Sequence, residues 1–500
     1  MKLRVLSAAV LAAGVGNAAT ADEADIDHGF DHDFGRFAEA RLKTAARPLM
    51  GLPGTLNQSA PATDGAYRTE AQPASQQVLL PGGLTARYLT REAADSTDMM
   101  AFYPAAAPTH LITCVEGDRE ELAGDGLPGY AAGDKFNPSV QRIELATGKV
   151  ETVLRGMDGC DGIRTTPWGS VLATEETDDG GAYEILNPLA TGNFTVQDRA
   201  TGAIVNTAGA PDTAQIAKRA ALPTIAWEGL ELLPSGVVIG GDELRPGTPA
   251  DADGGSMFKF VPAVPHAGGA IASLAESPLV AGSVYALQVS CRDNNQQYGQ
   301  GCEVGSAAWV PVGTATARSD ADTAGATGYY RPEDLHLDPA YRDEANAQAV
   351  RWCWTNTGNE GGANYAEVMC AVDQAPDTAS GTTRSVVVNR FVEGDTDFNS
   401  FDNLAFQPGT GNLYVIEDHD NGDIFACLRD GADRDLKSDG CVKMLSVKDS
   451  SAEPTGFIFD ASGTRAYLSI QHSDDTHMPA VDGYGTDDLL VISGFKIPKR

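Results

Sequence analysis

The chain of 500 residues carries 36 Lys and Arg against 69 Asp and Glu, a formal net charge of −33. With 42% hydrophobic and 21% charged residues, it has too little apolar sequence for an integral membrane protein and too much for a disordered chain. The negative charge repels a phosphate backbone at long range, which argues against a nucleic-acid partner. A small anionic substrate would need a local positive centre, such as an arginine or a metal ion.

The first 21 residues have the pattern of a signal peptide. Lys2 and Arg4 give a short positive region, an apolar run follows over residues 5–15, and residues 19–21 form a small-x-small cleavage site. The apolar run is too short to span a bilayer, and no later stretch has the pattern of a membrane span. We therefore expect residues 1–21 to be removed, and the protein to be periplasmic or secreted with no membrane insertion.

Residues 22–80 are weakly patterned and rich in Ala, Pro, Thr and Gln. We interpret them as an N-terminal arm that wraps around the body of the protein. From residue 81 to 500 the chain consists of short β-rich segments separated by Gly, Pro, Asp and Asn turns, with almost no helical periodicity. This pattern predicts one all-β domain rather than several smaller domains.

An internal repeat organises the all-β region. Three segments align closely, at residues 160–176, 227–243 and 401–418, and two looser copies lie at 332–359 and 454–472. Each close copy has an acid at its second residue, called here the leading acid. A Pro, a Gly turn, a β-rich stretch and a terminal acid pair follow, which is the pattern of a β-hairpin. Residues 85–155 supply a sixth, degenerate unit.

Six units of about four strands each predict a six-bladed β-propeller. One shared register then places the leading acids and terminal acid pairs near the central axis. Like charges gathered in one channel repel unless cations hold them, so we expect a metal-lined channel rather than exposed turn residues. The leading acids are Asp161, Glu228 and Asp402, with Glu333 in a looser copy, and the terminal acid pairs are Glu175–Glu176, Asp242–Glu243 and Glu417–Asp418. The other looser copy has Thr455 at this position.

Eight cysteines agree with an oxidising compartment. The two that remain after local pairing, Cys114 and Cys160, either form a further disulfide or leave Cys160 as a free thiolate, and both interpretations stay open. The local pairs that we expect to form disulfides are Cys291–Cys302, Cys353–Cys370 and Cys427–Cys441.

These motifs resemble the PhoX family of exported alkaline phosphatases, from about residue 85 to 480. The order and spacing of several short pieces carry the resemblance: Cys160 with residues 166–176 (TPWGSVLATEE), residues 228–229 with 240–243 and 258–261, 331–334 (RPED), 402–406 (DNLAF), 454–456 (PTG) and 469–472 (SIQH). The resemblance implies a six-bladed propeller that carries ferric iron and calcium on its axis and hydrolyses phosphate esters there. The chain departs from the family pattern in its Lys2-Leu3-Arg4 start, in Asp161-Gly162 after the cysteine, and in the additional Cys114.

Carried over by motif, the resemblance implies roles for matched residues. Cys160 and Glu228 would bind iron, and Arg331 and Glu333 would serve the substrate and calcium as the catalytic residues. Together with the repeated acids, the full set of predicted metal ligands is Cys160, Glu175, Glu176, Glu228, Asp242, Glu243, Glu333, Asp334, Asp402, Glu417 and Asp418.

The chemistry of phosphomonoester hydrolysis fits this set of residues. The reaction needs neutralisation of the phosphoryl oxygens and an activated oxygen nucleophile. Carboxylates suit Ca²⁺, and a thiolate added to them suits iron. Arg331 would bind phosphate oxygens through two hydrogen bonds, or else form a salt bridge with Glu333. The sequence has no P-loop, no G-x-S-x-G motif and no H-E-x-x-H motif, so NTPase, serine hydrolase and zinc protease functions lack support.

We therefore expect an exported, monomeric, metal-dependent phosphatase that acts on a small-molecule phosphate monoester with Ca²⁺ and Fe³⁺. Two alternatives stay open. One is a calcium-dependent propeller hydrolase of another class, such as a lactonase or phosphotriesterase. The other is a non-catalytic binding propeller that calcium stabilises. Metal analysis with a panel of substrates would separate the three.

Overall fold

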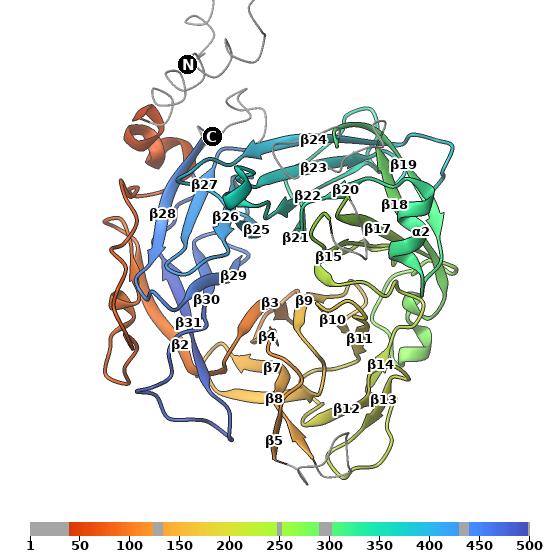
Figure 1. Ribbon diagram of the computed structural model, residues 1–500, viewed down its shortest axis with the longest axis horizontal. Helices are drawn as coiled ribbons and strands as arrows, with labels where there is room; N and C mark the ends of the chain where they lie inside the picture. The colour runs from red at the N-terminus through yellow and green to blue at the C-terminus, as the bar shows by residue number, and fades with distance from the viewer. Residues whose placement is uncertain (1–39, 124–133, 248–252, 290–302, 430–439, 499–500) are drawn as a thin grey trace, which may run out of the picture.

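A computed structural model describes residues 40–123, 134–247, 253–289, 303–429 and 440–498. The chain is all-β: sheets surround a central axis in a propeller-like arrangement, with few helices (Figure 1). This confirms the all-β class and the propeller-like arrangement. The described helical segments are short: residues 40–50, α2 (Ala317–Ala324), and the 3-10 turns η1 (Ala74–Gln76), η2 (Leu274–Glu276), η3 (Pro278–Val280) and η4 (Glu360–Gly362). None of these helices is long and apolar enough to cross a membrane.

The first two sheets come from consecutive parts of the chain. One contains β3 (Thr97–Tyr103), β4 (His110–Val115), β7 (Pro138–Glu144), β8 (Val150–Arg155), β12 (Phe194–Asp198) and β13 (Ala203–Val205). The next contains β9 (Cys160–Thr165), β10 (Val171–Glu175), β11 (Ala182–Ile185) and β14 (Ile216–Lys218). Their hydrogen-bonded orders are β13-β12-β8-β7-β4-β3 and β14-β11-β10-β9, so β3 and β9 each form one edge. A separate pair, β5 (Glu121–Ala123) and β6 (Lys135–Phe136), lies beside them.

The largest sheet has ten strands. It contains β15 (Trp227–Leu232), β16 (Val238–Asp242), β17 (Gly255–Pro262), β18 (Gly282–Val289), β19 (Gly305–Val312), β20 (Gly328–Tyr329), β21 (Pro332–Leu337), β22 (Val350–Asn356), β23 (Glu367–Asp373) and β24 (Val386–Glu393). Its two halves, β15–β19 and β21–β24, join where β19 pairs antiparallel with β24. A fully buried ion pair of 2.8 Å between Lys259 and Asp373 also connects the halves.

Two further sheets complete the arrangement. One contains β25 (Phe401–Phe406), β26 (Leu413–Glu417), β27 (Asp423–Cys427), β28 (Cys441–Val447) and β1 (Val78–Leu79). The other contains β29 (Glu453–Phe459), β30 (Arg465–Gln471), β31 (Thr486–Ser493) and β2 (Thr85–Ala94). The described strands therefore hydrogen-bond into five larger sheets and one pair, not into six separate sheets.

Six strands surround the axis. They are the innermost strands β3, β9, β15, β21, β25 and β29, each contacting the next, with β29 returning to β3 (Figure 1). The hairpins of the sequence repeat supply these strands, because each repeat begins with an innermost strand. The repeat therefore predicts which residues reach the centre of the molecule.

Residues from the start of the chain complete the last two sheets. β2 pairs with β31, and β1 pairs with β28. Residues 85–94 thus belong to the sheet that contains β29, β30 and β31. From the sequence, they were expected in the degenerate unit at residues 85–155. Residues 40–80 also contribute buried side chains to the core of these two sheets, among them Leu42, Met50 and Leu52. The predicted signal peptide, residues 1–21, lies outside the described residues.

Two of the predicted local disulfides are confirmed. Cys353–Cys370 joins β22 to β23, and Cys427–Cys441 joins β27 to β28. Each links two antiparallel neighbours directly opposite each other. The third predicted pair, Cys291–Cys302, lies outside the described residues.

Candidate metal centre and active site

The leading acids lie where the innermost strands depart from regular pairing. Each is the second residue of its strand, and the register with the next strand shifts beside it in every case. A β-bulge bends the strand and re-aims the side chain, so these carboxylates turn toward the axis instead of into a sheet face. The five leading acids are Asp98, Asp161, Glu228, Glu333 and Asp402.

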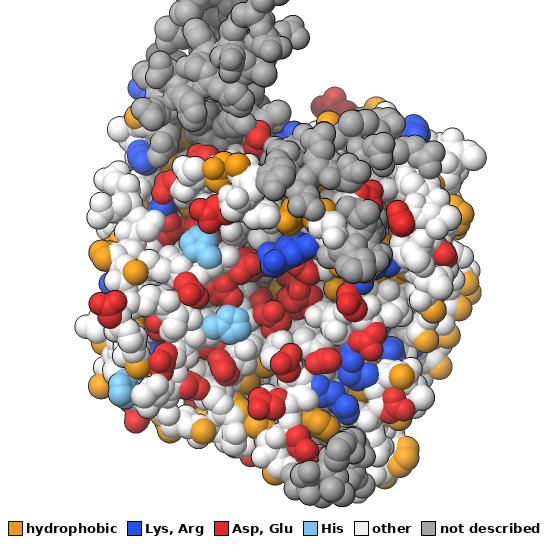
Figure 2. Space-filling view, in the orientation of Figure 1, with side chains coloured by type: hydrophobic (Ala, Val, Ile, Leu, Met, Phe, Trp, Pro, Cys, Tyr) orange, Lys and Arg blue, Asp and Glu red, His pale blue; other side chains and the backbone are white. Residues whose placement is uncertain are grey.

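These carboxylates meet in three overlapping groups. In each group one oxygen per residue lies within 4.8 Å of the others. Because neighbouring groups share a member, the acids form one continuous cluster along the axis. Figure 2 shows acidic side chains gathered over the middle of this face. The groups are Asp98–Glu116–Asp161, Asp161–Glu176–Glu228 and Glu228–Glu333–Asp402.

The two acids of each terminal pair have different roles. The amide of the second acid donates a hydrogen bond to the carbonyl of the residue before the innermost strand, as from Glu176 to Gly159 at 2.7 Å. This bond fixes the second acid beside the start of the innermost strand. Equivalent bonds run from Glu116 to Ser96, Glu243 to Ala226 and Asp418 to Ser400, and in the fourth unit from Thr357 to Arg331.

The first acid of each pair belongs to none of the three carboxylate groups and is held by other groups of the protein. Glu175 pairs with Arg199 at 2.7 Å, and Asp242 pairs with Arg318 at 2.7 Å. Glu417 accepts the amides of residues 399 and 423, each at 3.0 Å. All three are buried carboxylates with full sets of partners, which is the environment of a structural anchor.

Asp334 also has a structural environment. Its carboxylate lies 2.8 Å from Arg164 and 3.2 Å from His336. Burial raises its pKa, but His336 and Arg164 outweigh this effect and lower the pKa to about 2. Asp334 is therefore ionised and paired, and it belongs to none of the three carboxylate groups.

Arg331 and Glu333, the predicted catalytic residues, lie in contact with each other, and Glu333 belongs to the acid cluster. The guanidinium contacts Glu243 and lies 3.3 Å from Glu333 and 3.4 Å from Asp418. Burial lowers its pKa, but the three carboxylates outweigh that and raise it. Arg331 has a left-handed backbone with φ of 57°, which is uncommon outside glycine and is held here by the surrounding turn. The salt bridge with Glu333, given above as an alternative, is thus present, and the side chain is 17% exposed.

Cys160 is joined to Cys114 by a disulfide across a separation of 46 residues. The two cysteines lie on β9 and β4, both buried among apolar side chains. A disulfide sulfur is not a thiolate, so Cys160 does not offer the soft ligand predicted for iron. Of the two interpretations that the sequence left open, the structure shows the disulfide.

The buried acids repel one another. Burial raises the pKa of Glu228, and the neighbouring carboxylates of Asp161 and Glu176 raise it further. Burial likewise raises the pKa of Asp161 to about 8, and Glu116 contributes to that rise. Burial first and neighbouring carboxylates second also raise the pKa of Asp98, Glu176 and Asp402. Such a group either holds protons or holds cations, because ionised carboxylates this close are otherwise unstable.

The donor set fits a hard divalent cation. The three groups offer only carboxylate oxygens, which are the ligands that Ca²⁺ prefers, and Ca²⁺ accepts six to eight of them. Glu176, Glu228, Glu333 and Asp402, all predicted as ligands, belong to these groups. Glu243 and Asp418, also predicted, lie beside the cluster as partners of Arg331.

Two acids of the cluster were not predicted from the sequence, and a third was not predicted as a ligand. Asp98 and Glu116 belong to the degenerate first unit, and Asp161 was recognised as a leading acid but left out of the predicted ligands. A sequence signal for Asp98 exists: a Pro follows each of the five leading acids at the sixth position, as Pro104 follows Asp98 and Pro167 follows Asp161. Applied to residues 85–155, this spacing identifies Asp98 as the leading acid of the degenerate unit.

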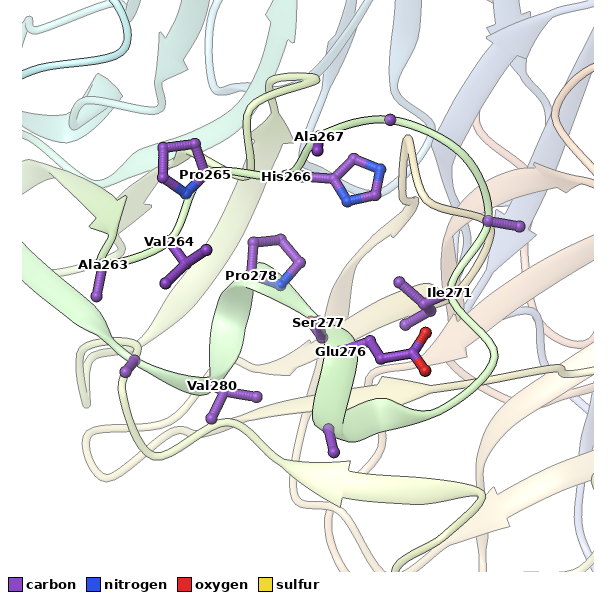
Figure 3. A pocket seen from close by; sticks show the side chains of 14 residues that line it. Ala263, Val264, Pro265, His266, Ala267, Ile271, Glu276, Ser277, Pro278 and Val280 are labelled. Atoms are coloured by element: carbon purple, nitrogen blue, oxygen red, sulfur yellow. The ribbon is translucent and has the colours of Figure 1, made fainter.

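A separate cavity of about 490 Å³ lies beside η2 and η3, away from the axis (Figure 3). Its walls are mostly small and apolar, with His266, Glu276 and Ser277 as polar members. It contains none of the predicted site residues. The acid cluster, and not this cavity, therefore has the charge and the donors that the predicted chemistry needs.

Comparison with known proteins agrees with the family resemblance. The sequence model described as alkaline phosphatase PhoX matches residues 157–474. Among solved structures, the Pseudomonas fluorescens PhoX complex with vanadate, a transition-state analogue, is 14% identical with a TM-score of 0.48, covering 87% of this chain and 98% of that one. The PQQ-bound aldose sugar dehydrogenase from Streptomyces coelicolor is 13% identical with a TM-score of 0.37, covering 83% and 99%. The search of curated proteins gave no match. Because the family match spans more than half of the sequence, the chain belongs to the PhoX alkaline phosphatase family.

Proposed function

We propose that the protein hydrolyses phosphate monoesters at a calcium cluster held by the axial carboxylates, with Arg331 binding the phosphate group. One observation carries the proposal: the three overlapping carboxylate groups lie directly beside Arg331, which contacts Glu333 of the third group. Membership of the alkaline phosphatase family supports the reaction class.

The site divides into a region for cations and a region for phosphate. On the side of Asp98, Asp161 and Glu228, no ion pair with a Lys or Arg is found within the described ranges, so excess negative charge collects there. We assign calcium to this side. Arg331 lies beside Glu333, where its guanidinium compensates part of the charge, and we assign the phosphate group to this end.

The residues of the chain prepare the phosphate site. When bound, Ca²⁺ supplies positive charge that neutralises phosphoryl oxygens. Arg331 presents a planar guanidinium that suits two phosphate oxygens at once. Glu333 orients that guanidinium, and Thr357 in turn donates a hydrogen bond to Glu333. The substrate oxygens would then replace one or more of the carboxylate contacts of Arg331.

Calcium is the metal of this proposal. The expected iron depended on a thiolate from Cys160, and that sulfur lies in a disulfide. A carboxylate cluster needs no thiolate to bind Ca²⁺. We therefore include no iron–thiolate site.

We extend the proposal to architecture and location. The ten-stranded sheet would be two blades joined through β19 and β24, which gives six blades around the six innermost strands. Residues 22–80 would be an N-terminal arm, of which the described residues 40–80 pack on blades five and six, and residues 81–500 the propeller. The signal-peptide pattern of residues 1–21 and the disulfides support a protein that is exported and works as a periplasmic or secreted monomer.

The experiment uses the purified full-length mature protein with p-nitrophenyl phosphate. We expect activity that a calcium chelator removes and added Ca²⁺ restores. Glu228→Gln keeps the shape of the side chain but removes a charge, and we expect at least a tenfold loss of both calcium affinity and activity. Full activity in the chelated protein would refute the calcium site. Calcium binding without hydrolysis of any phosphate monoester would instead support a binding propeller.

A further inference from the structure

The three carboxylate groups include no residue from one of the six innermost strands. Contacts among acids run from Asp98 through Asp161 and Glu228 to Asp402, which covers five of the six innermost strands. The sixth strand, β29, lies between the strands of Asp402 and Asp98. There the repeat has Thr455 in place of an acid.

A neutral hydrogen-bonded bridge fills this gap. The hydroxyl of Thr455 is the donor within reach of both Asp98 and Oδ1 of Asn403, which lies 2.6 Å away, and its single proton serves one of these two acceptors at a time. The Nδ2 of Asn403 donates to Oδ1 of Asp402 at 3.1 Å. The amide of Gly456 also donates to Oδ1 of Asn403, which fixes the amide orientation of that side chain. The two cluster ends are thus connected through two side chains that carry no charge.

Burial makes this bridge rigid. Thr455 is 0% exposed and Asn403 is 1% exposed, and each polar atom of the two side chains has a partner. Buried hydrogen bonds of this kind hold ligating carboxylates in one orientation, and removal of such a partner typically costs a metal site 10- to 100-fold in affinity. An acid in place of Thr455 would instead add negative charge beside Asp98, where charge is already in excess.

We propose that Thr455 and Asn403 are positioning residues that replace a sixth carboxylate and fix Asp98 and Asp402 for cation binding. The inference rests on the proposed calcium site and goes beyond it by assigning two uncharged residues to its geometry. Neither residue contacts a reacting atom, since both act through the acids that they hold.

The test measures Ca²⁺ binding to the metal-free, full-length mature protein by isothermal titration calorimetry. Thr455→Val keeps the shape and removes the hydroxyl, and we expect the Kd for calcium to rise about 10-fold or more. Phosphatase activity should fall at limiting Ca²⁺ and return toward the wild-type value at saturating Ca²⁺, which a purely structural defect would not produce. Thr455→Ser restores the hydroxyl and should restore the wild-type Kd.

Thr113→Val is the matched control. Thr113 is also fully buried, in β4, and its hydroxyl has no hydrogen-bond partner among the residues that the structure describes. This variant should bind calcium as the wild type does. Thr455→Ala is measured in parallel, so that the question is answered even where Thr455→Val does not fold.

The outcomes separate this inference from the proposed function. Wild-type affinity in both Thr455→Val and Thr455→Ala, with a clear loss in Glu228→Gln, would overturn the positioning role and leave the calcium site intact. A wild-type protein that binds no calcium would overturn both. A loss in both Thr455 variants, rescue by serine and no loss in Thr113→Val would establish the bridge.

Discussion

Nε of Arg199 lies 2.7 Å from Oε1 of Glu175, and Glu175 is completely buried. The next residue, Glu176, belongs to the axial acid cluster. Two adjacent glutamates therefore face in opposite directions, one held by a cation of the protein and the other available to a cation from solution.

The first prediction separates these two neighbours. Glu175→Gln removes the fully buried one of the three carboxylates that contact Arg199, and we expect it to cost about 2 kcal/mol of unfolding free energy with little change in calcium affinity. Glu176→Gln should lower calcium affinity with a much smaller effect on unfolding free energy in the metal-free protein. Urea denaturation and calorimetric titration of both variants check this, and a reversed pattern would contradict the assignment.

The second prediction concerns Arg331. Arg331→Lys keeps the charge but loses the planar pair of donors, so kcat/KM for p-nitrophenyl phosphate should fall about 10- to 100-fold. The melting temperature should change little. Arg465→Lys, at an exposed ion pair with Asp460, is the control and should retain full activity. If Arg331→Lys lowers only the melting temperature, Arg331 has a structural role.

The third prediction concerns pH and the metal-free protein. Raised carboxylate pKa values mean that the folded state binds protons more tightly than the unfolded state. The resulting stability is fully present below the unfolded pKa of about 4 and is lost as pH rises through the folded values, which for Asp161 is about 8. The metal-free melting temperature should thus fall between about pH 5 and pH 8.

Calcium provides the control for this pH dependence. With Ca²⁺ bound, the cation replaces the protons, so the fall in melting temperature should become shallow over the same range. A metal-free protein whose melting temperature stays constant or rises between these pH values would show that the axial acids are not coupled as described.

The fourth prediction concerns the Cys114–Cys160 disulfide. Because either single substitution breaks the same bond, Cys114→Ser and Cys160→Ser should each cost a similar 2–5 kcal/mol of unfolding free energy. Folded protein of both variants should bind the same amount of calcium. Peptide mapping under non-reducing conditions should recover a peptide that links the two cysteines. Loss of metal in Cys160→Ser alone would indicate a thiolate ligand after all.

The sequence predicted the part of the centre that repeats. A hairpin with an acid at a fixed distance before a Pro recurs along the chain, and because each hairpin begins with an innermost strand, Glu228, Glu333 and Asp402 were correctly expected together. Asp98 escaped notice because its unit keeps the acid and the Pro but little else of the repeat.

The sequence did not predict which terminal acids face the axis. Glu175 and Asp242 are anchored by Arg199 and Arg318, which lie 24 and 76 residues further along the chain. No local pattern connects such partners, since the folded sheets alone bring them together. The sequence left the Cys114–Cys160 disulfide undecided for the same reason, because β4 and β9 come from different repeat units.

The pairing of β2 with β31 has a consequence for the order of events after synthesis. The two strands come from opposite ends of the described chain, so the last sheet cannot be completed until nearly the whole polypeptide has emerged. β29, which contributes Thr455, belongs to that same sheet. A chain that lacks its last strand would thus leave β2 and β30 as open edges, and the cation centre would mature only as the final step of folding.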